Sequence, residues 1–272
     1  MSHDAGLLLL FRGVRKKFAP QTGTVIFRMQ AISGLPHRIR AVIFDVDGTL
    51  LDSMPMWNSI TYDYAALKGV AAPPGLSKTL NSLCLEQCAA YYRDVLGVSG
   101  TIEAIMAEIV DQARERYRTV VPEIPGAAAF TAALKSRGIH TAVATASDIR
   151  SLWPALERLS IAPNIDMAES CTTIGKSKES PDIYLKCASD FGASPAECVV
   201  FEDALYAVRT AKEAGFSVVG VFDPTHTAAE RAEFLALCDR CIPDYTGLLG
   251  ELLPPEDRDG PQALGNWGGI YV

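Results

Sequence analysis

Residues 41–53 read AVIFDVDGTLLDS, and this stretch decides the fold. Its first four residues form a continuous apolar run, which is typical of a strand buried on both faces of a parallel sheet. The run ends at Asp45, and Asp47 follows two positions later, so both acids are expected at the carboxyl end of that strand. Ligands bind at this edge of open α/β sheets. Because two acids are costly to bury without a cation or a substrate, the pattern predicts chemistry there.

The five residues DVDGT, which begin at Asp45, carry a first resemblance to a known family. They resemble the DxDGT motif with which phosphatases and phosphomutases of the haloacid dehalogenase-like superfamily end their first core strand. The plainer alternative is an Asx turn, in which both aspartates accept hydrogen bonds from backbone N–H groups. The apolar strand before the motif and the LLDS sequence after it favour the superfamily.

The composition limits the classes of function. With 272 residues and 49% hydrophobic side chains, the chain can form one large or two modest domains with a packed core. The net charge is −7, and residues 1–40 contribute +6 of it, which leaves −13 on the remainder. This acidic balance argues against a nucleic-acid partner. We find no apolar run near the roughly 18 residues that a membrane span needs, so no membrane partner is expected.

The seven cysteines are an odd number without the dense spacing of a secreted disulfide framework. They favour a reducing compartment, and we expect the protein in the cytoplasm. Cys238 and Cys241 form a CxxC pair, but no second pair of zinc ligands lies near it in the sequence. Ordinary packing is therefore a better interpretation of these cysteines than a zinc site.

Helical patterns follow the first motif. Apolar residues recur at helical spacing between Met56 and Leu67, and two further helices are predicted at 77–96 and 101–120. Together they predict an all-helical insertion, which we bound at residues 54–121. It resembles the cap that one branch of the superfamily inserts after its first motif to close over the site.

The rest of the chain predicts an α/β core. Residues 122–126, PEIPG, are expected to pair with residues 51–55 as a hinge. Helices then alternate with apolar strands at 140–144, 198–201 and 217–221, which predicts a parallel, doubly wound, Rossmann-like sheet. The domain boundaries that follow are a basic leader at 1–38, a core at 39–53 and 122–250, and a loose tail at 251–272. The leader is expected to be poorly ordered or an over-extended start.

Polar side chains follow the later strands as well. Thr145 and the backbone N–H groups after it suit an anion, although a threonine there is usually a helix cap. Lys178 heads KESPDIY and offers charge to a phosphoryl group, with Lys176 as a rival and a solvated loop lysine as the plain alternative. Glu202 and Asp203 end a third apolar strand. Four acids at one edge repel each other unless a divalent cation lies among them, and oxygen ligands beside a phosphate favour Mg²⁺.

These segments, in this order, resemble the four motifs of the superfamily across about residues 40–245. The resemblance implies catalysis by Asp45, as the nucleophile that becomes an aspartyl-phosphate, and by Asp47, as general acid and base. It implies phosphate binding by Val46, Thr145, Ala146 and Lys178. It also implies Mg²⁺ binding by Asp45, by Asp47 through its backbone carbonyl, by Asp203 and by Glu202 as a fourth or indirect partner.

The resemblance predicts a Mg²⁺-dependent phosphatase for a small phosphomonoester such as a sugar phosphate or a nucleotide. A sugar-phosphate mutase that resembles β-phosphoglucomutase is the main alternative, and it would need a site for a second phosphate. Leu85 and the pair Asp148-Ile149 stand where such mutases carry polar or basic groups, and they are poor phosphate ligands. A catalytically idle binding module is a further alternative, against which the intact acids argue. Dehalogenases and phosphonate hydrolases of this fold lack the aspartate at position 47.

Three cap residues are expected to select the substrate, namely Met54, Trp57 and Leu85. Trp57 fits the core of the cap equally well. The expected partner is a small phosphorylated metabolite, and the chain is expected to be a monomer or a weak dimer.

Overall fold

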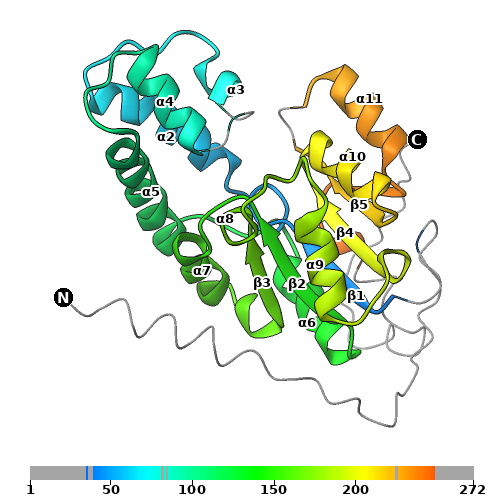
Figure 1. The fold of residues 1–272 in the computed structure, drawn as a ribbon. Coiled ribbons are helices and arrows are strands. Elements are labelled where there is room, and N and C mark those ends of the chain that lie inside the picture. The colour runs from blue at the N-terminus through cyan, green and yellow to red at the C-terminus, as the bar shows by residue number, and fades with distance from the viewer. Residues whose placement is uncertain (1–34, 36–38, 81–82, 84, 224–225, 249–272) are drawn as a thin grey trace.

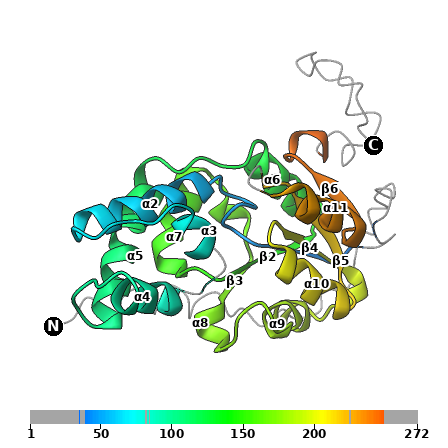
Figure 2. The same cartoon turned by 90° about the horizontal axis from the view of Figure 1, so that it is seen from above.

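The computed structural model describes residues 35, 39–80, 83, 85–223 and 226–248. Among these residues six strands form one sheet, in the order β3-β2-β1-β4-β5-β6, and all neighbouring strands are parallel (Figures 1 and 2). The strands are β1 (Ala41–Phe44), β2 (His140–Thr145), β3 (Met167–Ser170), β4 (Cys198–Glu202), β5 (Ser217–Val221) and β6 (Arg240–Ile242). The predicted parallel α/β core is confirmed. The predicted leader, apart from Leu35, and the predicted tail lie outside the described residues.

Two of the six strands, β3 and β6, were not predicted from the sequence. β3 reads MAES and only its last residue is buried, whereas β6 has three residues and lies at the opposite edge. An edge strand has one strand neighbour and needs no continuous apolar run, so its sequence carries a weak signal. The four predicted strands are all inner strands with buried residues throughout most of their length.

The register of the sheet aligns the ends of its three central strands. Phe44 pairs with Val143 of β2 on one side and with Phe201 of β4 on the other. The residues that follow these partners therefore reach the same edge of the sheet. This alignment places the first acidic motif between the ends of β2 and β4.

Helices cover both faces of the sheet. One face packs against α6 (Ala127–Ser136) and α7 (Ile149–Arg158), and the other against α9 (Asp182–Asp190), α10 (Leu205–Glu213) and α11 (Ala228–Leu237). The short helix α8 (Cys171–Ile174) follows β3. Because β1 alternates its side chains, Val42 and Phe44 enter the first layer and Ala41 and Ile43 the second. The view from above shows the two layers (Figure 2).

The inserted segment is helical, as predicted, but its middle helix is not continuous. It contains α2 (Met54–Leu67), α3 (Leu76–Leu80), α4 (Leu85–Asp94) and α5 (Ile102–Thr119), which lie together beyond one edge of the sheet (Figures 1 and 2). The prediction of one helix at 77–96 was wrong, since the segment forms α3 and α4. The domain boundaries at 54 and 121 stay a prediction.

Two short segments connect the cap helices to the core and pair with each other. Leu51 forms an antiparallel bridge with Glu123. The backbone N–H of Asp52 donates to the carbonyl of Pro122 at 3.0 Å, and that of Ile124 to the carbonyl of Leu50 at 2.9 Å. The pairing of the two predicted hinge segments is therefore confirmed. No helix in the described part of the chain is long and apolar enough to cross a membrane.

Candidate active site

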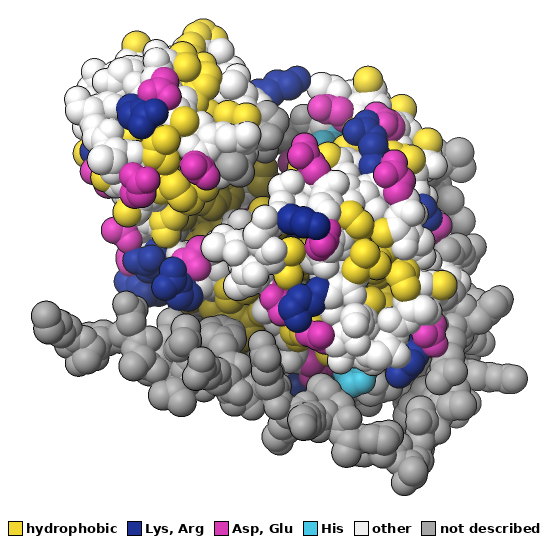
Figure 3. All heavy atoms as spheres, in the orientation of Figure 1, with side chains coloured by type: hydrophobic (Ala, Val, Ile, Leu, Met, Phe, Trp, Pro, Cys, Tyr) yellow, Lys and Arg dark blue, Asp and Glu magenta, His cyan; other side chains and the backbone are white. Residues whose placement is uncertain are grey.

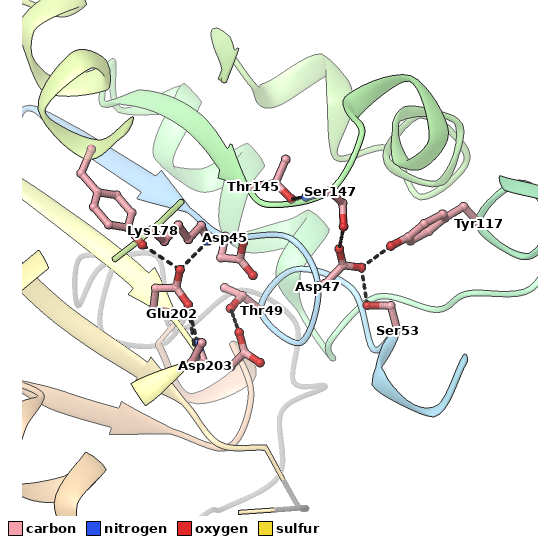
Figure 4. Close-up of polar contacts among 12 residues, drawn as sticks. Asp45, Asp47, Thr49, Ser53, Tyr117, Thr145, Ser147, Lys178, Glu202 and Asp203 are labelled. Carbon is pink, nitrogen blue, oxygen red and sulfur yellow. Dashed lines mark hydrogen bonds and ion pairs between the residues drawn. The ribbon is translucent and has the colours of Figure 1, made fainter. Parts of the chain in front are cut away.

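The ends of β1 and β4 bring three carboxylates together (Figure 4). Ligand oxygens of Asp45, Glu202 and Asp203 all lie within 4.8 Å of one another, and all three side chains are buried. Gly48 has a positive φ of +80°, and a Cβ at this position would lie 2.2 Å from Oδ2 of Asp203. A glycine is therefore needed both for the turn and for the close approach of the Asp203 carboxylate.

Lys178 lies inside this acidic cluster. Its ammonium group, in a side chain that is 3% exposed, forms ion pairs with Asp45 and Glu202. The rival Lys176 is exposed and instead pairs with Asp182 at 2.8 Å. Of the two lysines, the structure thus brings only Lys178 to the acids.

Glu202 is held by hydrogen bonds on both of its oxygens. The hydroxyl of Tyr184 donates to Oε1 at 2.8 Å, beside the bond from Lys178. The backbone N–H groups of Asp203 and Ala204 donate to Oε2 at 3.1 and 3.2 Å. Because both of its oxygens are engaged, Glu202 is better suited to orient Lys178 and the Asp203 turn than to bind a cation directly.

Burial changes the ionisation of the cluster. It raises the pKa of Asp45 to about 7, although the nearby Lys178 ammonium acts in the opposite direction. Burial, with the neighbouring Asp45 and Glu202 carboxylates, also raises the pKa of Asp203 well above its usual value. Burial disfavours the charged form of Lys178, but the carboxylates of Asp45 and Glu202 outweigh it and hold its pKa well above the usual value. The single ammonium group of Lys178 therefore does not balance the three carboxylates of the cluster.

The donor set of the cluster fits a divalent cation. Thr49 donates to Oδ1 of Asp203 at 3.2 Å, and Lys178 binds Oδ1 of Asp45. Among the described residues, no hydrogen bond reaches Oδ2 of either aspartate. Two buried carboxylates with an oxygen left for a ligand are typical of sites for hard cations such as Mg²⁺. The side chain of Asp47 lies outside this cluster, so of its oxygens only the backbone carbonyl stays a candidate ligand.

The Asp47 carboxylate instead lies among four hydrogen-bond donors (Figure 4). Ser53 donates to Oδ1 at 2.6 Å, Trp57 Nε1 donates to the same oxygen at 3.4 Å, and the hydroxyl of Tyr117 also donates to it. Ser147 donates to Oδ2 at 2.6 Å. The donors come from the hinge, from α2 and α5 of the cap, and from the loop after β2.

The three other predicted phosphate-binding residues lie at the ends of β1 and β2. Thr145 is 1% exposed, and its oxygen accepts a hydrogen bond from the backbone N–H of Ser147 at 3.0 Å. This bond is typical of a turn, and it leaves the hydroxyl proton for another acceptor. Ala146 is exposed beside it, and Val46 is buried in the turn after β1.

The three predicted cap residues lie in different surroundings. Met54 and Leu85 are half-buried first residues of α2 and α4, and Leu85 packs against the hydrophobic core. Trp57 packs against the same core and also reaches Asp47. Trp57 thus lies in the hydrophobic core and beside Asp47, and its role in substrate selection stays a prediction. The cap and the core meet across a hollow whose depth is lined by hydrophobic side chains (Figure 3).

Sequence reasoning missed three residues that contact Asp47, namely Ser53, Tyr117 and Ser147. Tyr117 shares a helical face with the buried Ile105, Ile109 and Ala113, so its spacing indicates packing alone. Ser53 and Ser147 directly follow predicted motifs, and that position was the signal that could have found them.

Comparisons with known proteins agree with this geometry. Residues 39–215 match the family model of the haloacid dehalogenase-like hydrolases. Hexitol phosphatase B of Escherichia coli K12 is 28% identical over 181 residues, which cover 66% of this chain and 82% of that protein. β-Phosphoglucomutase of Bacillus subtilis is 28% identical over 197 residues, which cover 67% of this chain and 83% of that protein. CbbY from Rhodobacter sphaeroides, crystallised with phosphate, has the same fold with a TM-score of 0.66 at 23% identity, covering 79% of this chain and 99% of that one.

Proposed function

Since this chain belongs to the haloacid dehalogenase-like hydrolase family, we propose that it is a Mg²⁺-dependent phosphatase for a small phosphomonoester. The observation that carries the proposal is the cluster in which buried Lys178 joins Asp45 to Glu202, with Asp203 beside them. A carboxylate beside a fixed ammonium group and a cation site suits nucleophilic attack on phosphorus. Hexitol phosphatase B is among the relatives, so we propose a phosphorylated sugar or sugar alcohol as the substrate class.

The proposed reaction has two steps. An oxygen of Asp45 attacks phosphorus, the bond to the leaving oxygen breaks, and Asp47 gives that oxygen a proton. Asp47 then takes a proton from water, whose oxygen attacks phosphorus. The bond to Asp45 breaks, and inorganic phosphate leaves.

The remaining site residues are proposed to hold the phosphoryl group. Lys178, the hydroxyl of Thr145 and the backbone N–H groups of Val46 and Ala146 would bind its oxygens. Asp45, Asp203 and the backbone carbonyl of Asp47 would hold Mg²⁺, which supplies positive charge to the transferring group.

One observation favours hydrolysis over phosphate transfer between two sugar positions. Asp148 caps the amino end of α7, where its carboxylate accepts from the backbone N–H of Arg150 at 3.3 Å and from the hydroxyl of Ser151 at 3.0 Å. A protein carboxylate thus already occupies this helix terminus. The preceding residue, Ser147, donates its hydrogen bond to Asp47. The Asp148 carboxylate also pairs with the Arg150 side chain at 3.3 Å, so it disfavours the second phosphate of a mutase mainly by occupying the hydrogen-bond donors of this helix terminus.

The proposal is tested by measuring phosphate release from a panel of sugar, sugar-alcohol and nucleotide monophosphates with Mg²⁺ and with EDTA. We expect release from at least one sugar or sugar-alcohol phosphate and its loss with EDTA. Conversion of a sugar 1-phosphate that depends on a bisphosphate primer, without net phosphate release, would instead establish the mutase.

Magnesium is expected to raise the thermal midpoint of unfolding more at about pH 8 than at about pH 5.5. In the unfolded chain Asp45 ionises near its ordinary value of 3.8, whereas in the fold its pKa is about 7. Without metal, the fold therefore loses stability as the pH rises from the pKa of Asp45 in the unfolded chain to its pKa in the fold. The cation binds the ionised carboxylate, which is present at the higher pH. Differential scanning fluorimetry with Mg²⁺ or EDTA measures the shift. A shift that is equal at both pH values, or that persists in Asp203→Asn, would contradict the site.

Lys178→Met is expected to lower turnover about 10- to 100-fold and to destabilise the fold by about 3 kcal/mol, because it leaves buried carboxylates without a counter-charge. Lys176→Met is the matched control, since its partner Asp182 is exposed. It should change neither quantity measurably. Steady-state kinetics and urea unfolding measure both variants, and equal effects from the two would refute the assignment of Lys178.

A further inference from the structure

At the Asp47 carboxylate, two of the cap helices contact a proposed catalytic residue of the core. Two of its donors, Ser53 and Ser147, belong to the hinge and to the core loop. The other two, Trp57 and Tyr117, project from α2 and α5 of the cap. Figure 4 shows Tyr117 reaching Asp47 from the side opposite Asp45.

The direction of the hydrogen bond from Tyr117 is fixed by its neighbour. Trp57 Nε1 lies 3.2 Å from the Tyr117 oxygen, and an indole N–H can only donate. The tyrosine oxygen therefore accepts from Trp57 and directs its own proton to Asp47. The two rings also meet edge to face, with centroids 6.3 Å apart, which limits their rotation.

The backbone that carries Tyr117 is tied to the core. Arg158 of α7 donates to the carbonyl oxygen of Tyr117 at 3.2 Å and also to that of Val121. These carbonyls lie at the carboxyl end of α5, where a cation is also favoured by the helix dipole. Tyr117 itself is 1% exposed. Its ring, its hydroxyl and its backbone are therefore all held in place.

We propose that Tyr117 is a positioning residue that fixes the Asp47 side chain for its two proton transfers, to the leaving group and from water. The inference rests on the proposed function for the role of Asp47. A catalytic acid or base that loses one fixed hydrogen-bond partner can still transfer protons but is less well oriented, and small misplacements of a catalytic group are costly. Phenylalanine has the same ring as tyrosine, so a Tyr117→Phe substitution removes the hydroxyl alone.

Tyr117→Phe is expected to lower kcat for a sugar or sugar-alcohol phosphate about 10- to 100-fold while KM changes less than about threefold. In an Asp47→Asn background the same substitution should have no further effect on kcat, because the residue it orients is gone. Tyr64→Phe is the matched control. Its hydroxyl, also in the cap, donates to Glu108 and not to a site residue, and kcat should stay at the wild-type value.

Crystal structures of Tyr117→Phe and of the wild type give a readout that needs no substrate. We expect the Asp47 carboxylate to turn to a different rotamer or to become disordered in the variant. Three results would each contradict the positioning role of Tyr117. These are an Asp47 rotamer that is unchanged in Tyr117→Phe, a wild-type kcat in that variant, and a loss of kcat on Tyr117→Phe that is as large in the Asp47→Asn background as in the wild type. If the wild-type protein released phosphate from no monoester, the proposed function would be wrong. The crystal structures would still show whether Tyr117 orients the Asp47 carboxylate.

Discussion

Asparagine in place of Asp45 is expected to lower phosphate release by at least about 10⁴-fold, the largest effect of any single substitution in this chain. The amide keeps the shape of the side chain but has no carboxylate oxygen to attack phosphorus. Lys178 keeps its ion pair with Glu202, so the fold should survive. The variant also removes one of three crowded acids, and the thermal midpoint should not fall below that of the wild type.

Phosphate release in the steady state, together with detection of a phosphorylated aspartate after an acid quench, measures the Asp45→Asn effect. The wild type should yield the phosphoprotein and the variant should not. Asp94→Asn is the matched control, because this carboxylate is exposed on the cap and pairs with Arg93. Near-normal turnover by Asp45→Asn would remove the nucleophile from the proposed reaction.

Asparagine in place of Asp47 is expected to lower kcat for a sugar phosphate about 10²- to 10⁴-fold, because neither proton transfer then has a partner. The effect should depend on the leaving group. With p-nitrophenyl phosphate the first step needs no protonation, and only the hydrolysis of the aspartyl-phosphate is slowed.

Stopped-flow measurement of p-nitrophenol from Asp47→Asn should therefore show a burst of about one equivalent per site, followed by slow turnover. The Asp45→Asn variant should show no burst under the same conditions. If Asp47→Asn turned over both substrates at the wild-type rate, Asp47 would have no role in proton transfer.

The inner strands of the fold could be predicted from the sequence because burial on both faces demands continuous apolar runs. The run before Asp45 is one example, and Cys198–Glu202 is another. The outer strands β3 and β6 could not be predicted, because an edge position leaves their residues free to be polar. The break between α3 and α4 was missed because apolar spacing continues through it.

Site residues could be predicted from the sequence where they directly follow a predicted strand, because the strand fixes their position in the fold. Asp45, Thr145 and Glu202 each lie at the carboxyl end of a central strand, and a parallel sheet brings such ends to one edge. Lys178 was predicted from its resemblance to a motif. Tyr117 could not be found in this way, because its bond to Asp47 spans 70 residues and depends on how the cap is packed on the core.

The buried cluster at the end of β1 and β4 has a further consequence for ion selection. Three carboxylates and one ammonium group carry a formal charge of −2 when all are ionised. An ion of valence two brings this enclosed group to electroneutrality, whereas Na⁺ or K⁺ leaves an excess charge in surroundings that solvate it poorly. At the proposed cation site, discrimination between monovalent and divalent ions would thus be set by the number of carboxylates relative to the one ammonium group of Lys178. Ionic radius would then need to distinguish only between divalent ions.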